Sequence, residues 1–331
     1  MAADKKRLLL PDEMTSPGWE LVKARADVET VVFKPRMPEA DFRRLLNDVD
    51  GVALTSTPLR AADIDAAPRL RAVGRLGVGF DAVDVDKLTA RGIPLMTCGT
   101  DNAPTVAEYA MFMMLALCKR GTGFDAMTRQ GRWGERFADP PTELLGKTLL
   151  IIGFGRIGTR IARRCLAMEM TVEVYDPYVP AATVRAAGCN PVTDLDAALP
   201  RADFVTIHCP KTPDTVGMFN AARLARMKPT ARLINSARGG LIDEAALYTA
   251  LSTGKLAGAG IDVFSPEPPL SDNPLFTLAN VIVSPHIAGN TIESLDRRAA
   301  TTVRNLLLVL DGGVPDADFV VNPEALQAKK R

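Results

Sequence analysis

A glycine-rich turn between an apolar segment and a helical segment constrains this chain more than any other feature. Residues 149–158 read LLIIGFGRIG. In a strand–turn–helix unit the first glycine allows a tight turn, the second lets a pyrophosphate approach the backbone, and the third lets the helix pack on the strand. The N-terminus of such a helix also offers N–H groups to an anion. The run therefore predicts a dinucleotide-binding βαβ unit that uses Gly153, Gly155 and Gly158.

An acidic residue follows the next apolar segment at the spacing expected for such a unit. Asp176 comes after the run at 171–175, about 20 residues beyond the glycines. A carboxylate in this place accepts hydrogen bonds from the hydroxyls of an adenine ribose and repels a 2′-phosphate. We therefore expect NAD as the cofactor in preference to NADP, and we expect Arg156 at the pyrophosphate rather than at a 2′-phosphate.

The length of the chain and the alternation of its segments predict two α/β domains. Its 331 residues exceed the size, about 250–300 residues, at which a single hydrophobic core stops growing. Short apolar runs alternate with amphipathic segments, which is typical of βαβ units around parallel sheets. We expect N-terminal strands at 7–10, 28–33, 52–55, 72–76 and 94–97, and a doubly wound Rossmann sheet of six strands at 148–152, 172–175, 204–207, 231–234, 257–261 and 281–283.

Two long helices are expected near the domain boundaries. The segment 105–119 is apolar around most of its circumference but too short for a bilayer, so it predicts a buried helix or a subunit interface. Residues 121–146 look irregular and could form an arm around a partner. A final helix at 293–310 is expected to return to the N-terminal domain.

The connections near 98–102 and 288–291 are the expected hinges. They divide the chain into a substrate-binding domain, residues 1–100 and 291–331, and an NAD-binding Rossmann domain, residues 101–290.

Composition and charge argue against several classes of protein. The 40 basic and 39 acidic residues form no extended basic field, so we expect no nucleic-acid partner. Only three leucines follow Lys5, Lys6 and Arg7, far fewer than a secretory or membrane segment needs, so a cytoplasmic protein without a membrane partner is expected. The five cysteines are scattered without a C-x-x-C pair, so neither a disulfide framework nor a metal site is expected.

Chemistry-bearing side chains follow several of the predicted strands. His208 and His286 both lie at carboxyl ends, where ligands bind in doubly wound sheets. A histidine can donate a proton at neutral pH, and Glu267, in the preceding loop, could orient one imidazole nitrogen and favour the charged form. Arg238 supplies a planar guanidinium that matches a carboxylate. Each residue alone is more commonly structural, but together they suit hydride transfer to a 2-oxo acid.

Six motifs in order resemble the D-isomer-specific 2-hydroxyacid dehydrogenase family. They read GFGRIG, YDP, HCP, NSARGGLID, GIDVFSPEPP and SPHIAG, and the similarity extends from Val52 to Leu310. The resemblance implies that Arg238 binds substrate, that Glu267 pairs with His286, and that His286 donates and accepts the proton.

The resemblance also implies further contacts. In the other domain, which is flavodoxin-like in such relatives, the backbone at Val78 and Gly79 would hold the substrate carboxylate near Arg75. Relatives form dimers through the segment equivalent to 107–120, so a homodimer is expected. The expected cofactor contacts, besides the three glycines, are Arg156, Ile157, Asp176, His208, Pro210, Ala237, Asp262 on the nicotinamide amide, and Gly289.

Departures from the family pattern leave the acid open. Ala82 stands where Asn or His is common, and the TCGT of residues 97–100 replaces a frequent Asn-x-Pro. The phosphoglycerate branch often has an arginine where this chain has Thr55 and Ser56, so 3-phosphoglycerate ranks below glyoxylate, hydroxypyruvate or another 2-oxo acid.

Other functions stay as alternatives. Phosphite oxidation fits the same residues, whereas formate enzymes usually carry Gln at the position of Glu267. A corepressor that senses NAD is the alternative from another class. We expect no C-terminal regulatory domain, because the chain ends soon after its last long helix.

Overall fold

The computed structural model describes residues 5–327, and the chain forms two compact units. Unit 1 comprises Met1–Asn102 and Asn290–Arg331, and unit 2 comprises Ala103–Gly289. Both are α/β units built on parallel sheets, as the alternation of segments predicts. Among residues 5–327, no helix combines the length and the apolar character that crossing a bilayer requires.

Unit 1 contains a five-stranded parallel sheet in the order β2-β1-β3-β4-β5. This is the flavodoxin-like order, so the expected fold of the first domain is confirmed. The middle parts of its inner strands are apolar and fully buried because helices cover both faces, as in other parallel sheets. The strands are β1 (Lys6–Pro11), β2 (Val28–Phe33), β3 (Gly51–Leu54), β4 (Ala72–Arg75) and β5 (Leu95–Met96).

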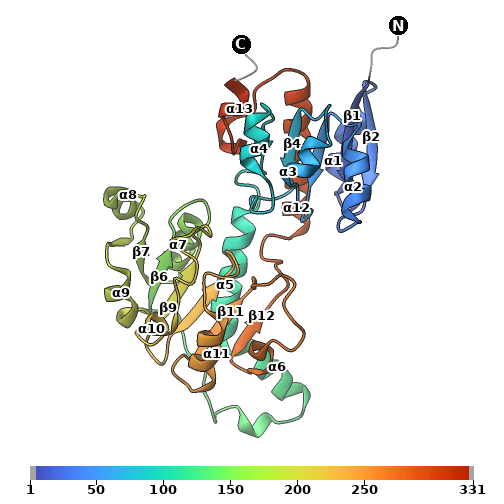
Figure 1. Ribbon diagram of the computed structural model, residues 1–331. Coiled ribbons are helices and arrows are strands. Elements are labelled where there is room, and N and C mark those ends of the chain that lie inside the picture. The colour runs from blue at the N-terminus through green and yellow to red at the C-terminus, as the bar shows by residue number, and fades with distance from the viewer. Residues whose placement is uncertain (1–4, 328–331) are drawn as a thin grey trace. The chain divides into compact units, whose positions relative to one another are not determined.

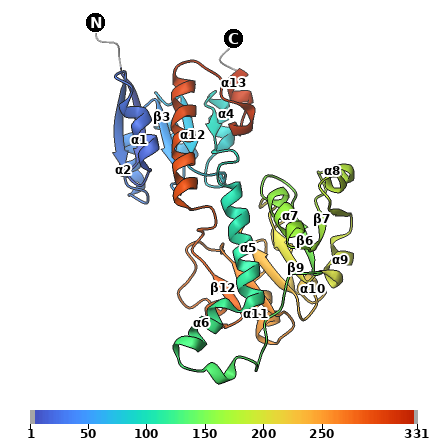
Figure 2. The ribbon, with the colours of Figure 1, turned by 180° about the vertical axis from the view of Figure 1, so that it is seen from behind.

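The two faces of this sheet are covered by different helices. One face packs against α1 (Ser16–Lys23) and α12 (Ile292–Leu310), and α12 lies across β3 and β4 (Figure 2). The expected return of the last long helix to the N-terminal part is therefore confirmed. The other face packs against α2 (Glu39–Leu46), α3 (Ala61–Asp65) and α4 (Val85–Ala90).

The segment after α12 closes one edge of the same sheet. It contains the short helices η4 (Ala317–Phe319) and α13 (Glu324–Gln327). Val320 pairs antiparallel with Met96 of β5. The buried side chain of Asn322 accepts a hydrogen bond from the Leu95 amide at 2.7 Å.

Unit 2 contains a seven-stranded parallel sheet in the order β12-β11-β10-β9-β6-β7-β8. The chain moves outward in one direction from β6 and in the other from β9, so the switch point of a doubly wound sheet lies between these two strands. The expected Rossmann fold is confirmed. The strands are β6 (Thr148–Ile152), β7 (Thr171–Tyr175), β8 (Asn190–Val192), β9 (Phe204–Ile207), β10 (Arg232–Asn235), β11 (Gly258–Ile261) and β12 (Val281–Val283).

Helices cover both faces of the second sheet as well. One face carries α5 (Ala103–Lys119), α7 (Gly158–Ala167) and α8 (Ala181–Ala186), and α5 runs beside β11 and β12 (Figure 1). The expectation of a buried helix at 105–119 is therefore confirmed. The other face carries α9 (Leu195–Ala198), η2 (Leu199–Arg201), α10 (Ala221–Leu224), α11 (Glu244–Ser252) and η3 (Pro274–Thr277).

The expectation of an irregular segment at 121–146 was wrong for its first part. Gly121–Arg129 forms helix α6, followed by the short η1 (Trp133–Glu135). None of the α6 side chains is fully buried, and its first turn contains Gly121 and Gly123, which have low helix propensity, so the sequence does not signal the helix. An i,i+4 ion pair between Asp125 and Arg129 supports it locally.

Candidate active site

The topology brings the carboxyl ends of three strands together at one end of the unit 2 sheet. Strands β10, β11 and β12 are neighbours and run in the same direction. Arg238 lies in the loop after β10, Glu267 in the loop after β11, and His286 in the loop after β12. Ligands bind at this end in doubly wound sheets.

His286 and Glu267 form a hydrogen-bonded pair. The His286 Nδ1 atom lies 2.8 Å from Glu267 Oε2. Because a carboxylate can only accept, Nδ1 carries the proton and Nε2 is left for a ligand. The hydrogen bond to Glu267 raises the pKa of His286, and this effect outweighs partial burial, which lowers it. The side chain is half exposed, at 50%, so the imidazole is accessible.

Glu267 is held ionised by two donors. Its other oxygen, Oε1, accepts a hydrogen bond from the Phe264 amide at 3.0 Å. Partial burial on its own would raise the pKa of Glu267, but the hydrogen bonds from His286 and Phe264 keep that pKa below its ordinary value. Glu267 therefore carries a negative charge beside the imidazole of His286, which gains a proton readily.

Asp262, at the end of β11, holds the loop that carries His286. The Asp262 carboxylate is fully buried and accepts hydrogen bonds from Ser284 Oγ at 2.6 Å and from the amides of Ile287 at 2.8 Å and Ala288 at 2.9 Å. His286 has a φ of 52°, a left-handed conformation that is uncommon outside glycine. These bonds sustain the strained turn. The contact of Asp262 with the nicotinamide amide stays a prediction.

The loop after β10 is shaped around Arg238. The side chain of Asn235 accepts from the Ala237 amide at 3.0 Å and donates to the Arg238 carbonyl at 2.9 Å. A Cβ atom on Gly239 would lie 1.7 Å from the Phe264 carbonyl oxygen, so only glycine fits there. The positive charge of Arg238 lowers the pKa values of both Glu267 and His286. In each case other groups and burial affect the pKa more than Arg238 does. Arg238 therefore follows the strand next to β11, at the end of the sheet that carries the pair.

Packing within the fold explains why two of the three glycines after β6 have no side chain, but it does not explain the third. Gly153 has a φ of 92°, and a Cβ there would lie 2.8 Å from the Cys209 amide nitrogen. A Cβ on Gly158 would lie 2.1 Å from the Gly153 carbonyl oxygen. Gly155 has no atom within 4 Å of its Cβ position among the described residues. Open space above this turn fits a pyrophosphate approaching the N-terminus of α7.

Asp176 connects the end of β7 to this glycine turn. Its Oδ2 accepts from the Phe154 amide at 2.7 Å, and its Oδ1 accepts from the Tyr178 amide at 2.9 Å. Each carboxylate oxygen can accept more than one hydrogen bond, so Asp176 keeps acceptor capacity for ribose hydroxyls.

His208, after β9, differs chemically from His286. Its Nε2 lies 2.9 Å from Thr206 Oγ1, and its buried Nδ1 has no hydrogen-bond partner among residues 5–327. Burial lowers the pKa of His208 to about 3, so the imidazole stays neutral at physiological pH and cannot supply a proton. Ser236 Oγ, after β10, is another buried atom that has no hydrogen-bond partner among the described residues. Sequence reasoning missed Ser236, since its burial is not visible in the motif.

The other predicted cofactor residues lie at the same edge of unit 2. Ile157 directly precedes α7, Pro210 follows β9, and Ala237 lies in the loop after β10. Gly289 follows the His286 loop and ends unit 2. Arg156 lies exposed in the glycine turn. Unpartnered polar atoms at His208 and Ser236, and open space at Gly155, fit a dinucleotide along this edge.

In unit 1, Arg75 shapes the loop that carries the predicted carboxylate-binding amides. Arg75 ends β4, and its Nε donates to the Gly79 carbonyl at 2.9 Å. Val78 and Gly79 are partly buried in the loop that this bond closes. After the neighbouring β3, the buried hydroxyls of Thr55 and Thr57 lack partners among the described residues. The substrate contacts of this loop stay predictions.

Comparisons with known proteins identify the family. The model of the D-isomer specific 2-hydroxyacid dehydrogenase NAD binding domain matches residues 111–288. D-3-phosphoglycerate dehydrogenase of Mycobacterium tuberculosis (strain ATCC 25618 / H37Rv) is 42% identical over 264 residues, which are 80% of this chain and 49% of that protein. The enzyme of the same name from Methanocaldococcus jannaschii is 35% identical over 325 residues, 98% of this chain and 61% of that one.

Solved structures share the whole architecture. A protein from Thermus thermophilus is 31% identical with a TM-score of 0.87, over 95% of this chain and 99% of that chain. The D-lactate dehydrogenase of Aquifex aeolicus, solved with NAD and lactic acid, is 28% identical with a TM-score of 0.81, over 97% and 98% of the two chains. The present chain spans about half the length of the Mycobacterium relative. It belongs to the D-isomer specific 2-hydroxyacid dehydrogenase family.

Proposed function

We propose that this protein is an NAD-dependent oxidoreductase that transfers a hydride between nicotinamide and C2 of a small D-2-hydroxy or 2-oxo acid. The observation that carries the proposal is the His286–Glu267 pair, at 2.8 Å, beside Arg238 at three neighbouring strand ends. The match of residues 111–288 to the family's NAD binding domain supports it. Unit 2 is the proposed cofactor domain and unit 1 the proposed substrate domain.

Each side chain has a defined task in this proposal. Arg238 binds the substrate carboxylate through its planar guanidinium, and backbone donors at Val78 and Gly79 contribute to the same group. During reduction His286 donates the proton on Nε2 to the carbonyl oxygen, and during oxidation it accepts that proton. Glu267 stabilises the imidazolium. The bound dinucleotide supplies or accepts the hydride.

The raised pKa of His286 sets the expected pH dependence. Reduction needs the protonated imidazole, so its rate is full below the pKa of His286 and falls as the pH rises through that value. Oxidation needs the neutral imidazole and gains rate over the same range. Because Glu267 raises this pKa, reduction stays active to a higher pH than an isolated histidine would allow.

A second candidate is oxidation of D-3-phosphoglycerate. It is favoured by relatives of that name at 42% and 35% identity over 80% and 98% of this chain. Thr55 and Ser56 instead of an arginine after β3 argue for an unphosphorylated acid. Phosphite oxidation and an NAD-sensing corepressor remain as alternatives.

A substrate panel tests the proposal. NADH oxidation is measured with glyoxylate, hydroxypyruvate and other 2-oxo acids, and NAD reduction with 3-phosphoglycerate and phosphite. Turnover of a 2-oxo acid, with NAD preferred over NADP, is expected. Firm NAD binding without turnover of any acid would instead favour the corepressor, and a preference for NADP would contradict the role of Asp176.

We also propose that the protein is a cytoplasmic homodimer. Phe112 of α5 is 48% exposed, and Trp133 and Phe137 in the following segment are 64% and 76% exposed. Such apolar exposure is typical of protein interfaces. Light scattering should give twice the chain mass of 35.6 kDa, and the mass of one chain would contradict the dimer.

A further inference from the structure

The loop that carries Glu267 has little hydrogen bonding of its own. Residues 265–273 include three prolines, which donate no backbone N–H, and most of the loop is exposed. Among the described residues, the one hydrogen bond between two backbone groups of this loop runs from the Asn273 amide to the Leu270 carbonyl at 3.1 Å. The loop therefore needs support from outside to hold Glu267 in place.

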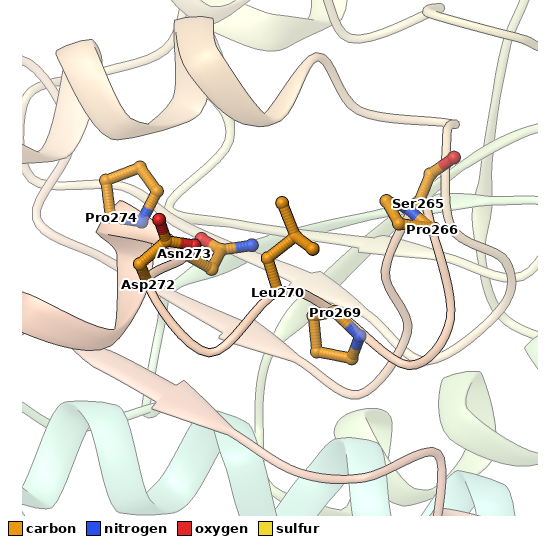
Figure 3. A pocket seen from close by; sticks show the side chains of 7 residues that line it. All are labelled: Ser265, Pro266, Pro269, Leu270, Asp272, Asn273 and Pro274. Atoms are coloured by element: carbon orange, nitrogen blue, oxygen red, sulfur yellow. The ribbon is translucent and has the colours of Figure 1, made fainter.

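A shallow pocket lies against this loop rather than a packed surface. It measures about 330 Å³ and is lined by loop residues, among them Ser265, Leu270 and Asn273 (Figure 3). None of the three candidate catalytic side chains lines it. Packing on this side does not hold the loop.

Glu244, in the first turn of α11, holds both ends of the loop. Its Oε1 accepts a hydrogen bond from the Ser265 amide at 2.8 Å. Its Oε2 accepts from Asn273 Nδ2 at 3.0 Å. Glu244 is partly buried, so water competes less for these bonds than on an open surface.

A short series of contacts leads from Glu244 to the imidazole. Ser265 is the chain neighbour of Phe264, whose amide donates to Glu267 Oε1 at 3.0 Å. Glu267 Oε2 in turn accepts from His286 Nδ1 at 2.8 Å. A shift of Ser265 would therefore move the Phe264 amide, which holds the Glu267 carboxylate next to His286.

The helix itself does not require the side chain of Glu244. Asp243 is the N-cap of α11 and accepts from the Ala246 amide at 3.0 Å. An acidic residue in the first turn favours the helix through its charge alone. Yet both oxygens of Glu244 face the loop, which a helix-stabilising role does not explain.

We propose that Glu244 is a positioning residue for the candidate proton donor: it holds both ends of the 265–273 loop and so keeps Glu267 within hydrogen-bond distance of His286. The catalytic consequence rests on the proposed function. The positional consequence does not, because it can be measured on the imidazole directly.

The charges around His286 predict the direction of the effect. Glu267 and Asp262 raise its pKa, and Arg238 lowers it. Asp262 is held by the His286 loop and Arg238 lies in the loop after β10, so Glu244 holds only the loop that carries Glu267. Loss of Glu244 should therefore lower the pKa of His286.

The experiment follows the imidazole Cε1–H signals by NMR against pH in the full chain. The chain has two histidines. His208 stays neutral above its pKa of about 3, so its signal does not move near neutral pH and serves as an internal reference. The signal that titrates there belongs to His286, and His286→Asn identifies it by its disappearance.

A reversed hydrogen bond provides a matched rescue. Glu244→Gln alone places an amide against the amide of Asn273, and Asn273→Asp alone places two carboxylates together. Both single variants should lower the pKa of His286. In the double variant the new amide at 244 donates to the new carboxylate at 273, so the titration should return toward wild type.

Asp194→Ala is the control for stability. Asp194 caps α9 in the same unit by accepting from the Ala197 amide at 3.1 Å, and the hydrogen bond described for its side chain does not involve the loop. Its loss should lower the melting temperature without moving the His286 titration.

The outcomes separate the two proposals. A lower pKa in both single variants and its recovery in the double variant support the positioning role, even if no 2-oxo acid is turned over. With a turned-over acid, the alkaline limit of reduction should move to lower pH in parallel. An unchanged titration in Glu244→Gln and Asn273→Asp, with only the melting temperature lowered as in Asp194→Ala, overturns the positioning role and leaves the proposed function intact.

Discussion

The ends of β9 and β12 carry the two histidines of the chain and give them opposite properties. Burial lowers the pKa of His208 to about 3, and the only side-chain partner described for it is the Thr206 hydroxyl. His286 is half exposed and bonded to Glu267, which raises its pKa. Both strands belong to one parallel sheet and end at the same edge.

The difference shows what each level of structure determines. The sheet brings both histidines to an edge where ligands bind. The loops determine which imidazole can carry a proton: within residues 5–327, only the loop after β11 places a carboxylate within hydrogen-bond distance of a histidine, at 2.8 Å. A buried neutral imidazole suits hydrogen bonding to a ligand, and a paired, accessible one suits proton transfer.

The largest expected effect separates the two histidines by activity. His286→Asn should lower kcat about 10²–10⁴-fold, because the proton donor is lost. Asparagine tolerates the left-handed φ of 52° at this position better than most residues, so the loop should be kept. Stopped-flow or steady-state rates measure the loss. NAD affinity, followed by fluorescence titration, should stay within twofold of wild type, and full activity would exclude His286 as the donor.

A smaller effect concerns the charge that distinguishes the two sites. Glu267→Gln removes the carboxylate that raises the pKa of His286, so that pKa should fall. The protonated form is then lost at a lower pH, and the alkaline limit of reduction moves to lower pH. The pH profile of kcat/KM measures this shift. A profile that coincides with wild type would mean that the pair does not control the imidazole.

Most of the fold follows from local patterns. Apolar runs between turn residues predicted both parallel sheets, because strands buried on two faces are continuously apolar. Strand β8 was missed because it has only three residues, contains Pro191 and lies at the sheet edge. Helix α6 was missed because its first turn contains Gly121 and Gly123 and none of its side chains is fully buried.

The sequence predicts which residues form the candidate site, but not the hydrogen bonds and the burial that give them their properties. Glu267 and His286 follow neighbouring strands, and their convergence follows from a parallel sheet. The three hydrogen bonds to Asp262 and the two to Glu244 connect segments far apart in sequence, so no local pattern shows them. The neutrality of His208 depends on burial, which a sequence motif does not reveal.

The smallest effect is expected at the neutral histidine, and it tests the comparison from the other side. His208→Gln keeps a neutral polar group near the position of Nε2, which contacts Thr206 Oγ1, but has no polar atom at the position of the buried Nδ1, which has no partner among residues 5–327. If that atom binds the cofactor, NAD affinity should weaken about fivefold, as expected for one hydrogen bond of about 1 kcal/mol. The pH profile of reduction should not change, since this imidazole does not titrate near neutral pH. A profile that loses its alkaline limit in this variant, while His286→Asn keeps it, would reverse the roles of the two strand ends.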